Sequence, residues 1–186
     1  MSTFRVVFTG GPVSGKTTLL NEFKKIYDKN GHASFVDEVP RELLKDAKLT
    51  GTRAVPWDCF HTFELRTLRI QIQKENRCKG LTFVDRSAID VLAYYEILGG
   101  VPPKFMVNLA KRRQYDSVFF FDLLPFEVDA ERYETTQEDA EKISNTIMKI
   151  YEGLGFDLIQ VPVMPVPERV KFVLDMLPEK FSPEIL

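Results

Sequence analysis

The residues whose types and spacing most clearly suit a chemical function run from Gly10 to Thr17. They read GGPVSGKT, which fits the pattern G-x-x-x-x-G-K-[ST]. An apolar run at 4–8 precedes them and a helical apolar pattern begins at about Lys16, so the free backbone N–H groups of the loop and of the helix start point at one anionic site. Lys16 would reach the terminal phosphates of a nucleotide, and the Thr17 hydroxyl would ligate Mg²⁺. The pattern predicts a nucleotide-binding loop, and a simple turn into a helix is the alternative. The residues expected to bind the nucleotide here are Gly10, Gly11, Pro12, Val13, Ser14, Gly15, Lys16, Thr17 and Thr18.

A bound Mg²⁺ also needs an acid at the end of a neighbouring strand. Asp85 follows the apolar run LTFV and is the first candidate, while Asp37 and Glu38 follow SFV and form the second. An aspartate in the place of Asp85 could instead cap the helix that begins in SAID. Arg86 comes next, and its planar donors would serve a phosphate or a substrate oxygen, or else a surface salt bridge.

Glu38 and Arg41 lie in the segment DEVPREL, at the carboxyl end of the second apolar run. A carboxylate there could accept the proton of an attacking hydroxyl or water, and Arg41 could anchor a polar acceptor. The alternative is structural: Pro40 starts a helix, Glu38 sits favourably against its positive end, and Arg41 is solvated. We expect catalysis to use Glu38 and acceptor binding to use Arg41.

The acceptor pocket is expected between residues 49 and 73, where Trp57 and Phe60 could stack on a ring. The alternative is that Phe60 and Phe63 are core residues, which their helical spacing more often indicates. Two segments, 49–58 and 123–136, carry Gly or Pro and mixed charge, and each is either a loop that closes over a ligand or an ordinary surface connection.

These residues must be positioned by an α/β fold. Short apolar runs alternate with longer segments of three- and four-residue apolar spacing, which indicates crossover units and a parallel sheet covered on both faces. Ligands of such sheets bind at the carboxyl ends of the strands. The expected strands are 4–8, 34–39, 81–85, 117–122 and 156–161.

Composition narrows the class of protein. The 186 residues are 44% hydrophobic and 28% charged, which favours one folded domain, and the net charge of −2 argues against a nucleic-acid partner. The longest basic run, 111–113, is expected to be a solvated helix end, with contact to a phosphate as the alternative. The chain shows neither a signal-like start nor an apolar run long enough for a membrane span, so we expect a cytoplasmic protein with reduced cysteines.

The motifs taken in order resemble the P-loop kinase group. More narrowly, they resemble the predicted AAA-type ATPase/kinase family, which is related to the nicotinamide riboside kinase domain of NAD-regulator proteins and to nucleoside and nucleotide kinases. The resemblance implies a three-layer P-loop NTPase fold with a five-stranded parallel sheet in the kinase arrangement, a single domain over 1–178 and a tail at 179–186. The motifs that carry it are TGGPVSGKTTL, VDEVPRELL, FVDRSAIDVLAY, ERYE, IYEGLGF and VPVMPVPERVKFVLDML.

The same resemblance implies roles for residues. Asp85 would assist Mg²⁺, Glu38 would be the acid of the acceptor side, and 123–136 would be a lid whose Arg132 stabilises charge on the transferring phosphoryl group. Arg132 could also be a solvated loop residue. Met164 and Pro165 would pack on adenine, or form only a Pro-rich turn.

Two functions follow from these residues. The first is a kinase that moves the γ-phosphate of Mg-ATP to a small hydroxyl acceptor, with a nucleoside as one candidate. The second is an ATPase or nucleotide-dependent switch that acts through a protein partner. The sequence leaves the acceptor open.

Overall fold

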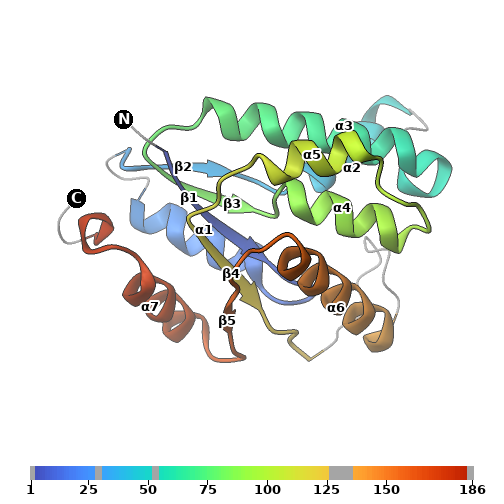
Figure 1. The fold of residues 1–186 in the computed structure, drawn as a ribbon. Helices are drawn as coiled ribbons and strands as arrows, with labels where there is room; N and C mark the ends of the chain where they lie inside the picture. The colour runs from blue at the N-terminus through green and yellow to red at the C-terminus, as the bar shows by residue number, and fades with distance from the viewer. Residues whose placement is uncertain (1–2, 28–30, 52–54, 126–135, 184–186) are drawn as a thin grey trace.

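The computed structural model describes residues 3–27, 31–51, 55–125 and 136–183, which form a parallel sheet between two helical layers (Figure 1). The strand order is β2-β3-β1-β4-β5, and every pairing is parallel. This confirms the expected five-stranded sheet and places the strand that ends at Asp85 beside the strand that leads into the GGPVSGKT loop. The strands are β1 (Phe4–Thr9), β2 (Ala33–Val36), β3 (Leu81–Asp85), β4 (Ser117–Phe121) and β5 (Ile159–Val161).

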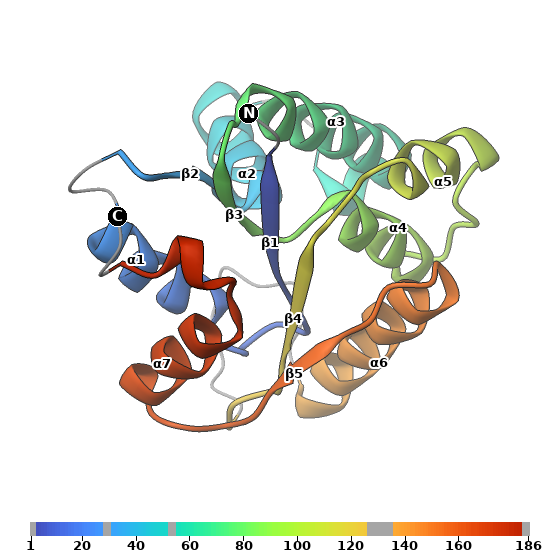
Figure 2. The ribbon, with the colours of Figure 1, turned by 60° about the vertical axis from the view of Figure 1, so that its left-hand side comes forward.

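Helices cover both faces of the sheet because each parallel connection must cross over it. Figure 2 shows α1 and α7 on one side, and α3 to α6 on the other. α2 packs against α3 beyond the edge strand β2. The helices are α1 (Lys16–Tyr27), α2 (Val39–Thr50), α3 (Pro56–Arg77), α4 (Ala88–Ile97), α5 (Lys104–Lys111), α6 (Gln137–Gly153) and α7 (Val166–Met176), and a short 3₁₀ helix η2 spans Glu179–Phe181.

The central strands are apolar on both faces, which explains their nearly continuous hydrophobic runs. Phe8 and Phe121 face the α1 and α7 layer, where their ring centroids lie 5.2 Å apart. Val7 and Phe120 face the opposite layer. The sheet is therefore a rigid base, and its carboxyl edge carries the loops that follow β1, β2 and β3.

Residues 49–50 and 56–58 are helical, so the expectation of a loop over 49–58 is wrong for these five residues, while 52–54 lie outside the described residues. α2 continues to Thr50 and ends at Gly51, which takes a left-handed φ of 67° and donates its N–H to the Ala47 carbonyl at 2.9 Å. Pro56 then starts α3 at a position where no backbone N–H is needed. Of the expected lid, residues 126–135 lie outside the described residues.

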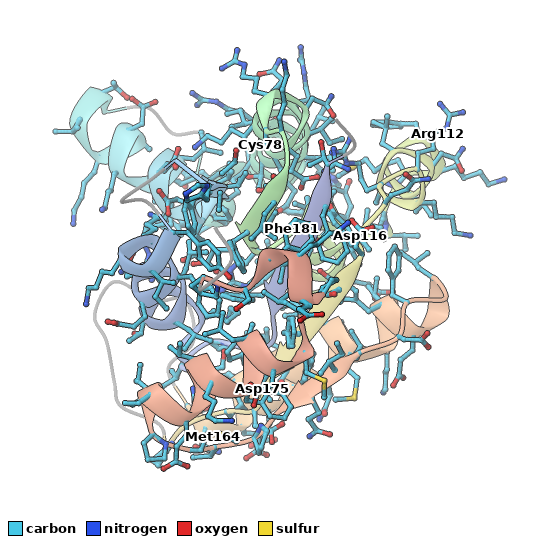
Figure 3. The ribbon with its side chains drawn as sticks, turned by 90° about the vertical axis from the view of Figure 1, so that its left-hand side faces the viewer. Cys78, Arg112, Asp116, Met164, Asp175 and Phe181 are labelled. Atoms are coloured by element: carbon cyan, nitrogen blue, oxygen red, sulfur yellow. The ribbon has the colours of Figure 1, made fainter. Side chains whose placement is uncertain are left out.

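The side chains of the basic run 111–113 differ in their exposure to solvent. Lys111 and Arg112 are exposed at the end of α5, as expected, and Figure 3 shows Arg112 at the outer surface of that helix. Arg113 instead donates from Nη2 to Oε2 of Glu75 at 2.7 Å, and Glu75 is fully buried. The expectation of a solvated end is wrong for Arg113, because a buried carboxylate on α3 requires a cationic partner.

The chain end packs against the start of the fold. Phe181 in η2 lies 4.9 Å from Phe4 between ring centroids, and its carbonyl accepts a hydrogen bond from the Tyr27 hydroxyl at 2.6 Å. In Figure 3, Phe181 lies well away from Met164, which precedes α7. None of the described helices combines the length and the apolar character needed to cross a membrane.

Candidate functional site

The GGPVSGKT loop joins β1 to α1 and needs glycine at two points. Gly10 has a φ of 129°, and a Cβ there would lie 2.6 Å from the Phe121 carbonyl oxygen. Gly15 has a φ of 79°, and a Cβ there would lie 2.9 Å from Nη1 of Arg169. Any side chain at either position would clash and strain the backbone. The loop therefore curls tightly at the carboxyl edge of the sheet.

Lys16 lies in the centre of this loop and is only 5% exposed. Its Nζ donates to the Gly10 carbonyl at 3.0 Å, to the Gly11 carbonyl at 2.6 Å and to Oγ of Ser14 at 2.8 Å. Burial, followed by the charge of Arg86, lowers the pKa of Lys16 to about 8. A buried ammonium held only by neutral oxygens is a strong site for an anion.

Thr17, in the first turn of α1, contacts Asp85, the last residue of β3. The Thr17 hydroxyl donates to Oδ2 of Asp85 at 2.6 Å. The other oxygen, Oδ1, is fully enclosed and has no hydrogen-bond partner in the described part of the chain. Burial and the charge of Glu38 raise the pKa of Asp85, and the charges of Lys16 and Arg86 only partly offset that rise. An unpartnered carboxylate oxygen beside a hydroxyl is the donor set that a Mg²⁺ ion would use.

Asp85 does not cap α4. Ser87 does so, by accepting a backbone N–H of the first turn at 3.0 Å, and Asp90 completes a capping box by accepting the Ser87 N–H at 2.8 Å. Asp90 also accepts from the hydroxyls of Thr9 and Tyr151, each at 2.6 Å. The turn after β3 is therefore fixed to the end of β1, which leads into the loop, and to α6.

Glu38 and Arg86 form the second part of the site. Nε of Arg86 donates to Oε1 of Glu38 at 2.8 Å, and Nε of Arg41 lies 3.2 Å from Oε2. Burial alone would raise the pKa of Glu38, but the charges of Arg86 and Arg41 outweigh it and lower that pKa. Asp37 points away and pairs with Lys24 at the surface. Glu38 is thus an ionised, inward-facing carboxylate.

Arg86 is held in an unusual backbone conformation, a left-handed φ of 65°. Its N–H donates to the Phe8 carbonyl at 3.0 Å, and its own carbonyl accepts from Nε2 of Gln71 on α3 at 3.0 Å. Its guanidinium lies 4.8 Å from the Tyr94 ring centroid and donates to the Tyr94 hydroxyl at 2.8 Å. A residue in a strained backbone conformation that hydrogen bonds hold on both the backbone and the side chain is typical of functional sites.

The aromatic residues between 49 and 73, where the acceptor pocket is expected, differ in burial and in what they pack against. Trp57 is 66% exposed at the start of α3. Phe60 packs edge-on against Tyr95, with ring centroids 5.3 Å apart. Phe63 is buried against Val39 of α2, so the core alternative holds for Phe63.

Two other expectations concern the nucleotide. Pro165 is the residue before the first turn of α7, and Met164 lies partly exposed beside it at the periphery of the molecule (Figure 3). Their contact with adenine stays a prediction. Arg132 lies outside the described residues.

Sequence reasoning missed Glu64. It is 3% exposed on α3, and no hydrogen bond or ion pair reaches it from the residues that the structure describes. Burial raises its pKa to about 8, and the nearby Arg86 charge opposes that rise. The signal was a row of polar residues at helical spacing within an apolar helix face, namely Glu64, Thr67, Gln71 and Glu75.

Sequence reasoning also missed Arg169, which lies 3% exposed on α7 and donates from Nη1 to the Ser14 carbonyl at 2.9 Å. Its spacing of four from Val173 places it on the buried face of that helix, which was the available signal. The nucleotide-binding loop is therefore contacted from the last helix of the fold.

The GGPVSGKT loop joins a buried strand to a helix, and the adjacent parallel strand ends in an acid. This arrangement is characteristic of P-loop NTPases. The family model described as AAA domain matches residues 5–169, and the chain belongs to that family. No curated protein sequence matches the chain.

Solved structures of low sequence identity share the fold. A thymidylate kinase from Ehrlichia chaffeensis has a TM-score of 0.66 at 13% identity, covering 96% of this chain and 100% of that one. NadR protein in complex with NR has a TM-score of 0.69 at 16% identity, covering 93% of this chain and 50% of that one. A deoxyadenosine kinase from M. mycoides has a TM-score of 0.59 at 14% identity, covering 92% of this chain and 97% of that one.

Proposed function

We propose that this protein is a kinase that transfers the γ-phosphate of Mg-ATP to a hydroxyl group of a small acceptor. The observation that carries the proposal is the position and state of Glu38. It is an inward-facing carboxylate that two arginines keep ionised, at the same sheet edge as the nucleotide-binding loop. A hydrolase needs only a positioned water, whereas an ionised acid flanked by arginines also suits an acceptor hydroxyl.

The other residues of the site would bind the phosphates and Mg²⁺ and stabilise the transferring group. The loop amides and Lys16 bind the phosphates. Thr17 and Asp85 would hold Mg²⁺, which when bound supplies positive charge against the phosphate oxygens. Glu38 accepts the proton of the acceptor hydroxyl, and Arg86 holds Glu38 in place. Arg132, in the expected lid, remains our candidate for the arginine that stabilises the transferring group.

A nucleoside is the first acceptor to test. The structural neighbours include a thymidylate kinase, a deoxyadenosine kinase and the NadR protein bound to NR. These neighbours guide the choice of acceptors, because fold similarity at such low identity does not transfer a substrate.

The test is a transfer screen with purified protein, Mg-ATP and a panel of nucleosides, nucleotides and pyridine ribosides. ADP release and acceptor mass are followed together. We expect one acceptor class to gain a phosphoryl group in step with ADP. ADP formed at a steady rate without a modified acceptor would instead favour the ATPase or switch function.

A further inference from the structure

Arg169 reaches the nucleotide-binding loop from a distant part of the chain. α7 packs against α1, and this contact brings the guanidinium over the loop. Nη1 donates to the Ser14 carbonyl at 2.9 Å and lies 2.9 Å from the place that a Gly15 Cβ would occupy. The last helix of the fold therefore forms one wall of the loop.

Among the described residues, none forms an ion pair with Arg169. Nε and Nη2 are fully enclosed and have no hydrogen-bond partner among the described residues. The charge of Asp122 acts on Arg169 from further away, and Oδ1 of Asp122 accepts a hydrogen bond from Gln160 at 2.8 Å. Burial lowers the pKa of Arg169. An unpaired buried guanidinium is costly, which indicates that an anion at the loop completes its environment.

The contact with Ser14 also orients a backbone donor. A trans peptide is planar, and its C=O and N–H point in opposite directions. Because the Ser14 carbonyl points at Arg169, the N–H of Gly15 points away from it. This N–H is one of the amides with which a P-loop binds phosphate. A charged donor on the carbonyl side also polarises the peptide and strengthens that N–H.

Ser14 connects two cations. Its carbonyl accepts from Arg169, and its hydroxyl accepts from Nζ of Lys16 at 2.8 Å. The Ser14 hydroxyl in turn donates to the Gly11 carbonyl at 2.9 Å. The loop is thus held between an ammonium and a guanidinium, both of which favour an anion.

We propose that Arg169 is a positioning residue for the nucleotide phosphates, which turns the Gly15 N–H toward them and adds a second buried positive charge to Lys16. The inference rests on nucleotide binding within the proposed function and not on transfer to an acceptor. Arg169 acts through the loop, by its contact with the Ser14 carbonyl.

The test measures binding of Mg-ADP and of inorganic tripolyphosphate by calorimetry. Arg169→Met keeps an apolar stem and removes the charge and the donors, so we expect both affinities to fall by roughly ten- to a hundredfold. Lys171→Met is the matched control, because Lys171 is exposed on the same helix and pairs with Asp175. We expect the control to bind both ligands like the parent protein.

Thermal unfolding without ligand separates this role from a structural one. Because Arg169→Met removes an unpaired buried charge, we expect its melting temperature to equal or exceed that of the parent, while the shift on adding tripolyphosphate shrinks. Parent-like tripolyphosphate binding in Arg169→Met would overturn the inference.

If the methionine variant does not fold, Arg169→Lys is decisive. Lysine keeps the charge but has no planar fork, so weaker tripolyphosphate binding than in the parent supports the inference, and unchanged binding overturns it. These readouts need no acceptor. A failed transfer screen would therefore not affect the conclusion about Arg169. A negative result for Arg169 would likewise not affect the conclusion about transfer to an acceptor.

Discussion

The phosphate side and the acceptor side of the site are built in different ways. All three hydrogen bonds of Lys16 go to loop atoms within six residues of it along the chain. Glu38 instead precedes α2, Arg86 lies between β3 and α4, and Glu64 lies on α3. Their geometry depends on how these separate segments pack. The contacts of Lys16 are thus encoded locally, although Asp85 and Arg169 join the phosphate side from distant parts of the chain. The acceptor side depends on the tertiary structure throughout.

The largest effect is expected on the phosphate side. Lys16→Ala removes the central cation of the loop, so we expect kcat/KM for ATP to fall by roughly a hundred- to a thousandfold. Lys24→Ala is the control, because Lys24 lies on the same helix but pairs with Asp37 at the surface. Steady-state kinetics with the acceptor found in the screen would check both variants. Activity close to the parent in Lys16→Ala would mean that the loop does not bind the reacting phosphates.

On the acceptor side, Glu64 should make stability depend on pH. Its pKa is raised to about 8 in the folded protein from 4.5. Between these values the unfolded chain ionises and the folded protein does not, so Glu64 lowers the free energy of unfolding progressively as the pH rises. Glu64→Gln stays neutral. We expect equal stability of parent and variant at about pH 4.5, and a gain on the order of a few kcal/mol in the variant at about pH 8.

Urea unfolding at both pH values measures this difference. Glu22→Gln is the control, since Glu22 pairs with Lys25 at the surface and should show little change at either pH. A stability difference between Glu64→Gln and the parent that stays constant with pH would contradict the assignment of a neutral buried acid.

A smaller effect is expected from Arg86→Lys. Lysine keeps the charge but cannot donate to Glu38 and Tyr94 from one planar group, so we expect kcat/KM for the acceptor to fall by about tenfold. The affinity for Mg-ADP should change little, because the Arg86 side chain contacts Glu38 and Tyr94 and lysine keeps its charge. Equal losses for acceptor and nucleotide would show that the two sides are not separable in this way.

Much of the fold could be predicted because its signals are local. Buried strands, the glycine loop and the acid at the end of β3 each follow from a short stretch of sequence, and parallel crossovers then bring Thr17 and Asp85 together. The segment 49–58 was misjudged because Gly and Pro mark helix ends as well as loops, and here Gly51 and Pro56 do so.

The rest could not be predicted because it depends on distant contacts. Arg169 lies 155 residues from Ser14 along the chain. Its spacing of four from Val173 indicates a buried helix face, but nothing local identifies the loop that it contacts. Arg113 was misjudged in the same way, since its partner Glu75 lies 38 residues away. Buried charges are recognisable only when the element that covers them is known.

Glu38 gives the most direct test of a kinase with an acceptor-side acid. Single-turnover transfer from Mg-ATP would be compared in Glu38→Gln and in Asp37→Asn, its neighbour that faces solvent. We expect Glu38→Gln to lose transfer by at least about a hundredfold while Mg-ATP binds as in the parent, and Asp37→Asn to behave like the parent. Transfer retained in Glu38→Gln would contradict the role given to this carboxylate and, with it, the proposed function.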